Sequence, residues 1–385
     1  MKHFMKRLLV VVISFCVLCN ASYPVHSQAE IADVDRISIK KEEKKIEYRT
    51  CGNFLYALKG ENAVIRGYLG DGVTKVKVDT LEIPSEVDGY PVTEIGEYAF
   101  CDNKMVTALG EVKREMVYFD KVVIPEGVVV IRNGAFEYTK MKRVILPESL
   151  REIKSFGFYH CKKLKSINIP HHLKGINACV FACCTGLERI EIPSNCQYIS
   201  SGAFSECKNL KKVILHEGLE HIYESAFYEC RNFQRIEIPD SVKVVEEAAF
   251  WNTNSLSKKK YKVIMRSMDT KMDVTSFSYS YLDLYAYPGA DILKYEKEDE
   301  YCKIHYMNPS LSAKKRKVKK GEETRLVLYG ARKKVKWTVK NPKVVKLSYH
   351  GGKRRNITVR GKKKGTTTVT ATYSGKTYQC EVRVK

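Results

Sequence analysis

Cysteine is the reactive residue whose spacing is most regular in this sequence. A thiol can act as a nucleophile, a metal ligand, a disulfide partner or a hydrogen-bond donor. Four thiols recur every 23 residues, each three residues after a phenylalanine: Cys161, Cys184, Cys207 and Cys230. Because a catalytic thiol is needed only once, this column favours structural thiols that are buried or bonded to loops. At least one disulfide stays an open alternative, since neighbouring repeats bring Cα atoms within disulfide range.

Other reactive side chains give less support for chemistry. Cys179, Cys183 and Cys184 lie together without the paired Cys/His set of a zinc site. The nine histidines are scattered, and the sequence contains neither a Gly-rich phosphate loop nor a nucleophile elbow. We therefore predict no catalytic residue, no cofactor and no metal, and a protein that is not an enzyme. A Cys/His protease assembled from distant residues, with Cys179 or Cys196 as the nucleophile, is the enzymatic alternative.

The phenylalanines indicate which elements position these thiols. Five of them are separated by 23 residues: Phe158, Phe181, Phe204, Phe227 and Phe250. Between them a strand-like phrase returns, and it reads RIEIP at both 189–193 and 235–239. Its alternation puts Ile190 and Ile192 on one buried face. A constant step predicts stacked coils of one unit, so we expect a mainly β solenoid of parallel strands with about seven coils of 23 residues.

These phrases resemble a known family of repeats. Ile-x-Ile-Pro, then Gly-Ala-Phe, then Cys-x-x-Leu is similar to the BspA-like, treponemal-type leucine-rich repeats of bacterial surface proteins. Residues 87–100 resemble the first repeat of that family and residues 284–295 its exit helix, so the resemblance spans about 51–306. It implies a cell-surface or secreted binding protein. Some members of the family are adhesins for host matrix proteins or for other bacteria.

The C-terminal stretch, residues 310–385, has a different pattern. About seven short strands with intervening glycine turns predict a small β-sandwich. Residues 321–324, 337–342 and 365–371 resemble bacterial group 2 Ig-like domains. This stretch holds 24 Lys and Arg against three acids, a charge of +21, so only +2 of the total +23 lies elsewhere. Such basicity departs from the Ig-like pattern and argues against a plain spacer.

The N-terminus predicts export. Residues 1–29 combine a basic start, an apolar run over 8–19 and small residues that could end a cleavable signal. The apolar run is short for a membrane span of about 20 residues, so we expect no transmembrane segment in the mature chain. The expected location is secreted or at the bacterial cell surface, which excludes most nucleic-acid roles.

Four regions follow from these patterns. We predict a signal peptide at 1–29, a leader and N-terminal β cap at 30–80, a solenoid with a closing cap helix at 81–308, and a basic Ig-like sandwich at 309–385. The cap should contain a hairpin around 54–65 and the closing helix should cover 288–298. The first coil carries about 13 inserted residues, which predict a loop at 103–118.

Two surfaces are candidates for binding. Outward strand residues should form two columns across a concave sheet, one of basic residues and one of acids and isoleucines. The isoleucines exposed in the second column favour an extracellular protein or glycan ligand. The alternative is a solvated face whose charges neutralise one another diagonally. The candidate partner-binding face is Arg143, Ile145, Arg189, Glu191, Lys212, Ile214, Arg235 and Glu237. Candidate contacts to an anionic wall polymer or glycan are Lys314, Lys315, Arg316, Lys333, Lys334, Arg354, Arg355, Lys362, Lys363 and Lys364.

The sequence thus predicts an exported surface protein for binding or adhesion. The repeats would hold a protein partner, and the basic domain would retain the chain at an anionic surface by charge, with attraction that salt weakens. An extracellular enzyme, an enzyme inhibitor and a purely architectural wall protein are the alternatives.

Overall fold

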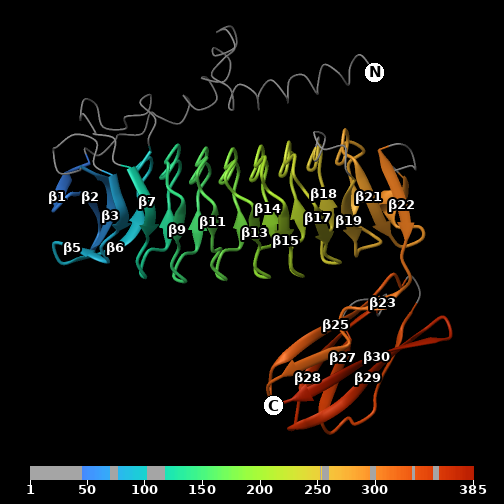
Figure 1. The fold of residues 1–385 in the computed structure, drawn as a ribbon. Coiled ribbons are helices and arrows are strands. Elements are labelled where there is room, and N and C mark those ends of the chain that lie inside the picture. The colour runs from blue at the N-terminus through green and yellow to red at the C-terminus, as the bar shows by residue number, and fades with distance from the viewer. Residues whose placement is uncertain are drawn as a thin grey trace.

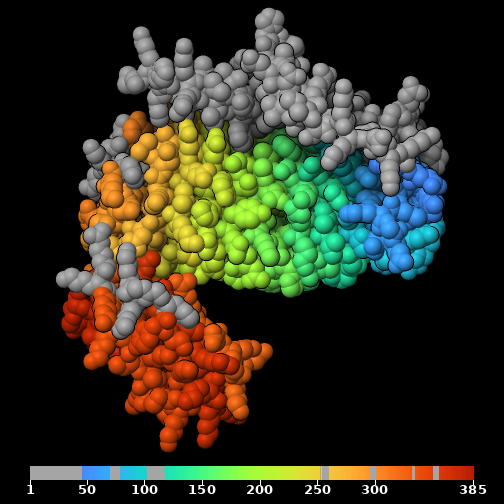
Figure 2. All heavy atoms as spheres, turned by 180° about the vertical axis from the view of Figure 1, so that it is seen from behind, coloured from blue at the N-terminus to red at the C-terminus, as the bar shows by residue number. Residues whose placement is uncertain are grey.

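The computed structural model describes residues 46–69, 77–101, 118–251, 253, 260–294, 301–331, 334–349 and 355–385. The predicted signal and leader, and the predicted loop up to residue 117, lie outside these ranges. Figure 1 shows coils side by side in one row, followed by a separate β unit. Figure 2 shows the coils packed into one continuous body, from which this unit projects at the C-terminal end. The mainly β fold is confirmed.

An antiparallel three-stranded meander closes the first end of the row. It consists of β1 (Tyr48–Cys51), β2 (Phe54–Lys59) and β3 (Asn62–Tyr68), and β3 pairs in parallel with the first back strand. The predicted hairpin around 54–65 is therefore confirmed. A buried Glu94 ties it to the next coils, since its carboxylate oxygens lie 2.6 Å from Lys59 Nζ and 2.6 Å from Arg132 Nη2.

Each coil contributes one strand to a front sheet and one to a back sheet. The front strands are β4 (Lys77–Glu82), β7 (Tyr118–Val123), β9 (Arg143–Ile145), β11 (Ser166–Ile167), β13 (Arg189–Glu191), β15 (Lys212–Ile214), β17 (Arg235–Ile238), β19 (Tyr261–Met265), β21 (Leu282–Ala286) and β22 (Cys302–Tyr306). The back strands are β6 (Tyr90–Ile95), β8 (Val130–Ile131), β10 (Glu152–Ile153), β12 (Gly175–Ile176), β14 (Tyr198–Ile199), β16 (His221–Ile222), β18 (Val244–Val245) and β20 (Lys271–Met272). The short β5 (Glu86–Val87) pairs with β6 in an antiparallel hairpin. Neighbouring coils pair in parallel, as predicted.

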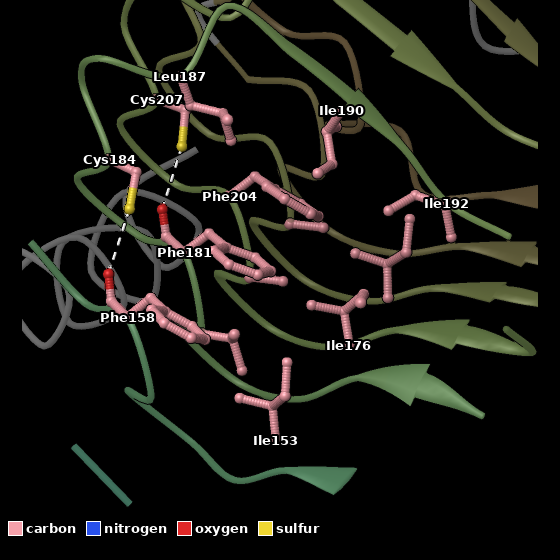
Figure 3. Packing of buried hydrophobic residues seen from close by; sticks show 14 of the residues in the cluster. Ile153, Phe158, Ile176, Phe181, Cys184, Leu187, Ile190, Ile192, Phe204 and Cys207 are labelled. Atoms are coloured by element: carbon pink, nitrogen blue, oxygen red, sulfur yellow. Dashed lines mark hydrogen bonds between the residues drawn. The ribbon is translucent and has the colours of Figure 1, made fainter. Parts of the chain in front are cut away.

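A column of phenylalanine rings forms the centre of the solenoid (Figure 3). Successive rings stack with centroids 5.0–5.6 Å apart, and the column is Phe100, Phe136, Phe158, Phe181, Phe204, Phe227, Phe250 and Phe277. Stacked, offset pairs of aromatic rings are favourable beyond the area that they bury. Phe250 and Phe277 are separated by more residues than the 23-residue repeat period. The array therefore contains one coil more than a count of 23-residue intervals indicates.

The four predicted thiols line this column and bond to the loops. Each buried Sγ donates to the carbonyl oxygen of the phenylalanine one coil earlier, over 3.1–3.2 Å: Cys161 to Phe136, Cys184 to Phe158, Cys207 to Phe181 and Cys230 to Phe204. Figure 3 shows the bonds of Cys184 and Cys207. None of the 11 described cysteines is in a disulfide, so the structure realises the hydrogen-bonding alternative for these four thiols. At the far end Ser280 Oγ takes the same place and donates to the Phe250 carbonyl over 2.8 Å.

Glycine in the Gly-Ala-Phe phrase has a backbone reason. From Phe100 to Phe250, the residue two before each stacked phenylalanine is in the left-handed region, with φ of 59° at Gly134 and 62° at Gly202. Glycine adopts this region without steric cost. Other coils place Ser225 or Ala248 there, at φ of 54° and 52°. The turn geometry is thus imposed by the stacked coil even where the residue is not glycine.

The C-terminal unit is a sandwich of two four-stranded sheets. One sheet is β23 (Ser310–Leu311), β25 (Glu323–Tyr329), β28 (Asn356–Gly361) and β27 (Val345–Tyr349). The other is β24 (Lys315–Val318), β30 (Lys376–Val384), β29 (Gly365–Tyr373) and β26 (Lys336–Val339). Their inner faces bury Trp337 and aliphatic residues in a core separate from that of the solenoid. The predicted sandwich is confirmed. The predicted closing helix is a single 3₁₀ turn, η1 (Asp291–Lys294), in its described part.

Candidate partner-binding face

The eight residues predicted for the partner-binding face lie on four front strands, with their side chains turned away from the core. Strand register aligns Arg189 with Lys212 and Lys212 with Arg235, and it aligns Glu191 with Ile214. The basic column and its neighbour are therefore real. The remaining three are Arg143, Ile145 and Glu237, with Arg143 and Ile145 on β9 and Glu237 on β17.

Charges on this face pair both along a strand and between neighbouring coils. Arg189 Nη2 lies 3.4 Å from Glu191 Oε2, and Arg235 Nη2 lies 3.1 Å from Glu237 Oε2. His216 Nε2 reaches Glu191 Oε1 from the next coil at 3.0 Å, and this contact, followed by Arg189, holds the pKa of Glu191 below its ordinary value. Exposed ion pairs of this kind contribute only about 0–1 kcal/mol to stability. Much of the face is therefore accounted for as a surface of paired charges exposed to solvent.

The front sheet is interrupted in its middle. β11 pairs with β9 before it, and β13 pairs with β15 after it, but among the described strands no ladder joins β11 to β13. Asn168, directly after β11, changes the bonding of this coil to the coil before it. Its side-chain amide donates to the Leu146 carbonyl over 3.0 Å and its Oδ1 accepts from the Leu146 amide at 3.2 Å. In other coils a backbone carbonyl accepts this bond, as Ile145 does from Ile124.

The back sheet breaks at the same coil, one step earlier. No ladder of the described back strands joins β10 to β12. Asn177 Nδ2 instead donates to the Ile153 carbonyl over 2.7 Å, and the Tyr198 hydroxyl lies 3.1 Å from Asn177 Oδ1. Two asparagine side chains thus replace backbone bonds between one coil and the coil before it. Asparagine amides can compete in this way with backbone ladders.

The displaced coil leaves a hollow of about 620 Å³ on the front face. Its apolar lining includes Ile167, Ile169 and Pro193, and both isoleucines are only partly buried. The corresponding Ile190 and Ile192 of the next coil are each 1% exposed. The remaining lining residues are Lys165, Ser166, Asn168, His171, Glu188, Arg189, Glu191, Ser194 and His216. An apolar floor with a charged rim suits the anchoring of one side chain of a protein partner.

The hollow is the candidate binding feature that the sequence prediction missed. The predicted face contained Arg189 and Glu191 of its rim, but neither isoleucine of its floor. The available signal was Asn168, because corresponding positions carry Ile145, Glu191 and Ile214. An amide side chain at a strand end can bond to the backbone, whereas isoleucine cannot.

Family models match both parts of the chain. The BspA type leucine rich repeat region matches in six copies over residues 129–257, and the group 2 bacterial Ig-like domain matches residues 308–382. The chain carries BspA-type leucine-rich repeats and a bacterial Ig-like domain. Comparison with curated proteins gave no match.

Three solved structures are similar to the chain. A leucine rich repeat protein from T. pallidum is 29% identical, with a TM-score of 0.44, over 53% of this chain and 88% of that one. A leucine-rich repeat protein from Bacteroides ovatus is 19% identical, with a TM-score of 0.41, over 64% and 70% of the two chains. A leucine rich cell surface protein from Faecalibacterium prausnitzii is 16% identical, with a TM-score of 0.21, over 57% and 88%.

Three buried thiols of the leucine-rich repeats, those of Cys184, Cys196 and Cys230, lack the surroundings of a catalytic nucleophile. Cys196 is 0% exposed, its Sγ donates to the Leu173 carbonyl over 3.2 Å, and burial raises the pKa of its thiol to about 12. Burial also raises the pKa of the Cys184 and Cys230 thiols. Catalytic thiols need a lowered pKa and some exposure. Among the described residues, no group of three or more His, Cys, Asp or Glu could hold a metal ion. No helix in those same ranges is long and apolar enough to cross a membrane.

The Ig-like domain places its predicted cations in different surroundings. Lys314, Lys315 and Arg316 lie at the start of β24, Lys334 precedes β26, and Lys362, Lys363 and Lys364 form the turn between β28 and β29. Lys333 and Arg354 lie outside the described residues.

Arg355 is used inside the chain. Its Nη2 lies 3.2 Å from Asp240 Oδ1 and its Nη1 lies 3.2 Å from Asp269 Oδ2, both acids of the last repeats. Nearby, the Tyr329 hydroxyl donates to Glu217 Oε1 over 3.0 Å. Burial raises the pKa of Asp240 to about 6, against the opposing effect of Arg355. Arg355 therefore joins the Ig-like domain to the repeats and is not free to contact a polymer.

Proposed function

We propose that this chain is an exported cell-surface binding protein that holds a protein partner on its front sheet, anchored in the hollow between β11 and β13. The observation that supports this function is the hollow itself. Its floor exposes parts of Ile167 and Ile169 at positions that are buried in neighbouring coils. The family models of surface leucine-rich repeats and Ig-like domains agree with a binding role.

Interface energetics explain why a hollow is a better anchor than the flat columns beside it. A few desolvated contacts in pockets dominate protein interfaces, while exposed charge pairs around them mainly exclude water. Here Arg189 and Glu191 are already paired with each other on the rim. An apolar or aromatic side chain that covered Ile167 and Ile169 would remove apolar surface from water at about 25 cal/mol per Å².

Paired variants test the hollow. Full-length protein carrying Ile167→Asp and Ile169→Asp is compared with Val274→Asp, a change at an apolar side chain that is 56% exposed elsewhere. Partners are first captured by wild-type protein from host matrix and bacterial envelope preparations, then purified and measured by biolayer interferometry. We expect at least a tenfold loss of affinity in the double variant and no change in Val274→Asp. Equal affinity for wild type and the double variant would place the binding site elsewhere.

The basic Ig-like domain supplies a second part of this proposal. A charge of +21 over residues 310–385 supports docking to an anionic wall polymer or glycan, which would retain the exported chain at a surface. The full chain should bind isolated wall material at low salt and leave it at high salt. Binding that does not change with salt would contradict electrostatic docking. No described contact favours an enzyme, an enzyme inhibitor or a purely architectural role over this one.

A further inference from the structure

Three turns that are far apart in sequence meet at one end of the Ig-like domain. They are residues 319–322 between β24 and β25, residues 340–344 between β26 and β27, and residues 362–364 between β28 and β29. Backbone bonds hold them together: the Gly321 amide donates to the Gly361 carbonyl over 2.9 Å, and the Lys362 amide donates to the Val344 carbonyl over 2.8 Å. We call this group of turns the distal tip.

The distal tip concentrates charge of one sign. Its exposed cations are Lys319, Lys320, Lys340, Lys343, Lys362, Lys363 and Lys364. Its acid is Glu322, whose Oε1 lies 3.5 Å from Lys319 Nζ in an exposed pair. Like charges this dense repel one another and lower the stability of the fold. Solubility does not require them either, since added acids improve solubility more than added lysines.

Among the described residues, the contacts between the domain and the repeats do not involve the tip. The contacts of the domain to the repeats come from Tyr329 at the end of β25 and from Arg355 at the start of β28. Since β25 begins near the tip and β28 ends there, these contacts lie at the opposite end of the sandwich. Figure 1 marks the chain end C beside the tip, away from the junction near β23. A long ligand can therefore reach the tip without displacing the repeats.

The chemistry of the tip selects a class of ligand. Lysine acts as a compact point charge toward phosphate, whereas planar bidentate recognition needs arginine. The three turns contain no arginine and no aromatic ring that could stack on a base or a sugar. All seven lysines are exposed, so they do not enclose a single small anion. Affinity must come from several charges along one polymer.

We propose that the distal tip is a binding site for a linear polymer of closely spaced phosphate groups. The inference rests on the proposed docking function and gives it a place and a ligand chemistry. Each phosphate that a lysine neutralises releases counterions, so the logarithm of the binding constant falls with the logarithm of salt concentration by about 0.7–0.9 per contact.

The test compares two variants with the same change in charge. The tip variant is Lys320→Gln, Lys362→Gln, Lys363→Gln and Lys364→Gln. The control variant is Lys271→Gln, Lys303→Gln, Lys336→Gln and Lys376→Gln, all exposed and outside the tip. Full-length wild type and both variants are titrated with long-chain polyphosphate at several salt concentrations, after circular dichroism has verified equal folding. We expect the salt slope of the tip variant to fall by about 3 and that of the control to fall by less than 1.

The outcomes separate the site from the docking function. If wild type binds and both variants lose equal affinity, the tip is refuted while electrostatic docking stands. If wild type binds no polyphosphate and no wall material, docking itself fails. Heparin that bound more tightly than polyphosphate at equal charge would refute the phosphate assignment. Orthophosphate at the same phosphate concentration should not compete, and effective competition would refute a site built from many contacts along a polymer.

Discussion

Replacing stacked phenylalanines tests how the solenoid is held together. Phe204 is fully buried and stacks on Phe181 at 5.4 Å and on Phe227 at 5.3 Å. Phe204→Leu keeps a large apolar side chain in place but removes both aromatic contacts. At about 0.5–1.5 kcal/mol for each aromatic pair, the single change should destabilise the protein by about 1–3 kcal/mol.

Coupling between two such changes gives the sharper measurement. Phe181→Leu and Phe204→Leu remove the same shared contact, so the double variant should lose less than the sum of the two. The expected coupling free energy is about 0.5–1.5 kcal/mol. Phe136→Leu with Phe204→Leu is the control pair, because Phe158 and Phe181 lie between them. Its coupling should be within about 0.5 kcal/mol of zero.

Urea unfolding provides the assay. Circular dichroism and tryptophan fluorescence must give coincident transitions and an unchanged m value, because repeat arrays can lose two-state behaviour. Zero coupling for the adjacent pair would refute ring stacking as a source of stability and would leave burial alone as the explanation. Coupling as large in the control pair would show that the column acts as one unit rather than through neighbours.

Three further outcomes follow from burial and charge. Under native conditions at pH 8, the buried Cys207 should resist alkylation while the half-buried Cys51 reacts, as peptide mass spectrometry can measure; equal labelling would contradict the buried column. Burial raises the pKa of Glu137 from 4.5 to about 7, so its contribution to stability is complete below pH 4.5 and is lost as pH rises through about 7. Glu137→Gln should therefore raise Tm at pH 8 but not at pH 4.5, and an equal rise at both would contradict this. Arg355→Ala leaves a buried Asp240 without its cation and should increase the radius of gyration in X-ray scattering; an unchanged radius would show that other contacts suffice.

Repetition made most of the fold predictable. The spacing of Phe181, Phe204 and Phe227 indicated the coil, and the alternation of Ile190 and Ile192 indicated which side chains are buried. From these two patterns the register of the front columns followed, and the structure confirms it. A core built from identical layers tolerates few changes in register, because a slip of one residue turns every apolar side chain outward.

The count of about seven coils rests on a constant 23-residue step, and the last coil departs from that step because its length changes outside the core. Phe250 and Phe277 stack at 5.0 Å, as closely as any pair in the column, although their separation in sequence exceeds the repeat period. The stack requires one ring per coil and sets no limit on the length of the connecting turns. A search for a constant step therefore loses a coil whose turns are longer. The contact of Arg355 with the repeats was missed for another reason. Its partner acids, Asp240 and Asp269, come from repeats far earlier in the chain, and no local pattern joins them to Arg355.

The hollow and the least regular part of the ring column lie at the same displaced coil. The ring spacing is widest between Phe158 and Phe181, at 5.6 Å, and the tilt is greatest between Phe181 and Phe204, at 15°. These two steps flank the coil whose Asn168 and Asn177 bond to the preceding coil through their side chains. Because each coil contacts only its neighbours, a local shift is not passed along the array. The Asn177 amide satisfies the Ile153 carbonyl, which the broken back ladder would leave unbonded. A solenoid can thus open one apolar hollow in its middle while the stacks on either side stay regular.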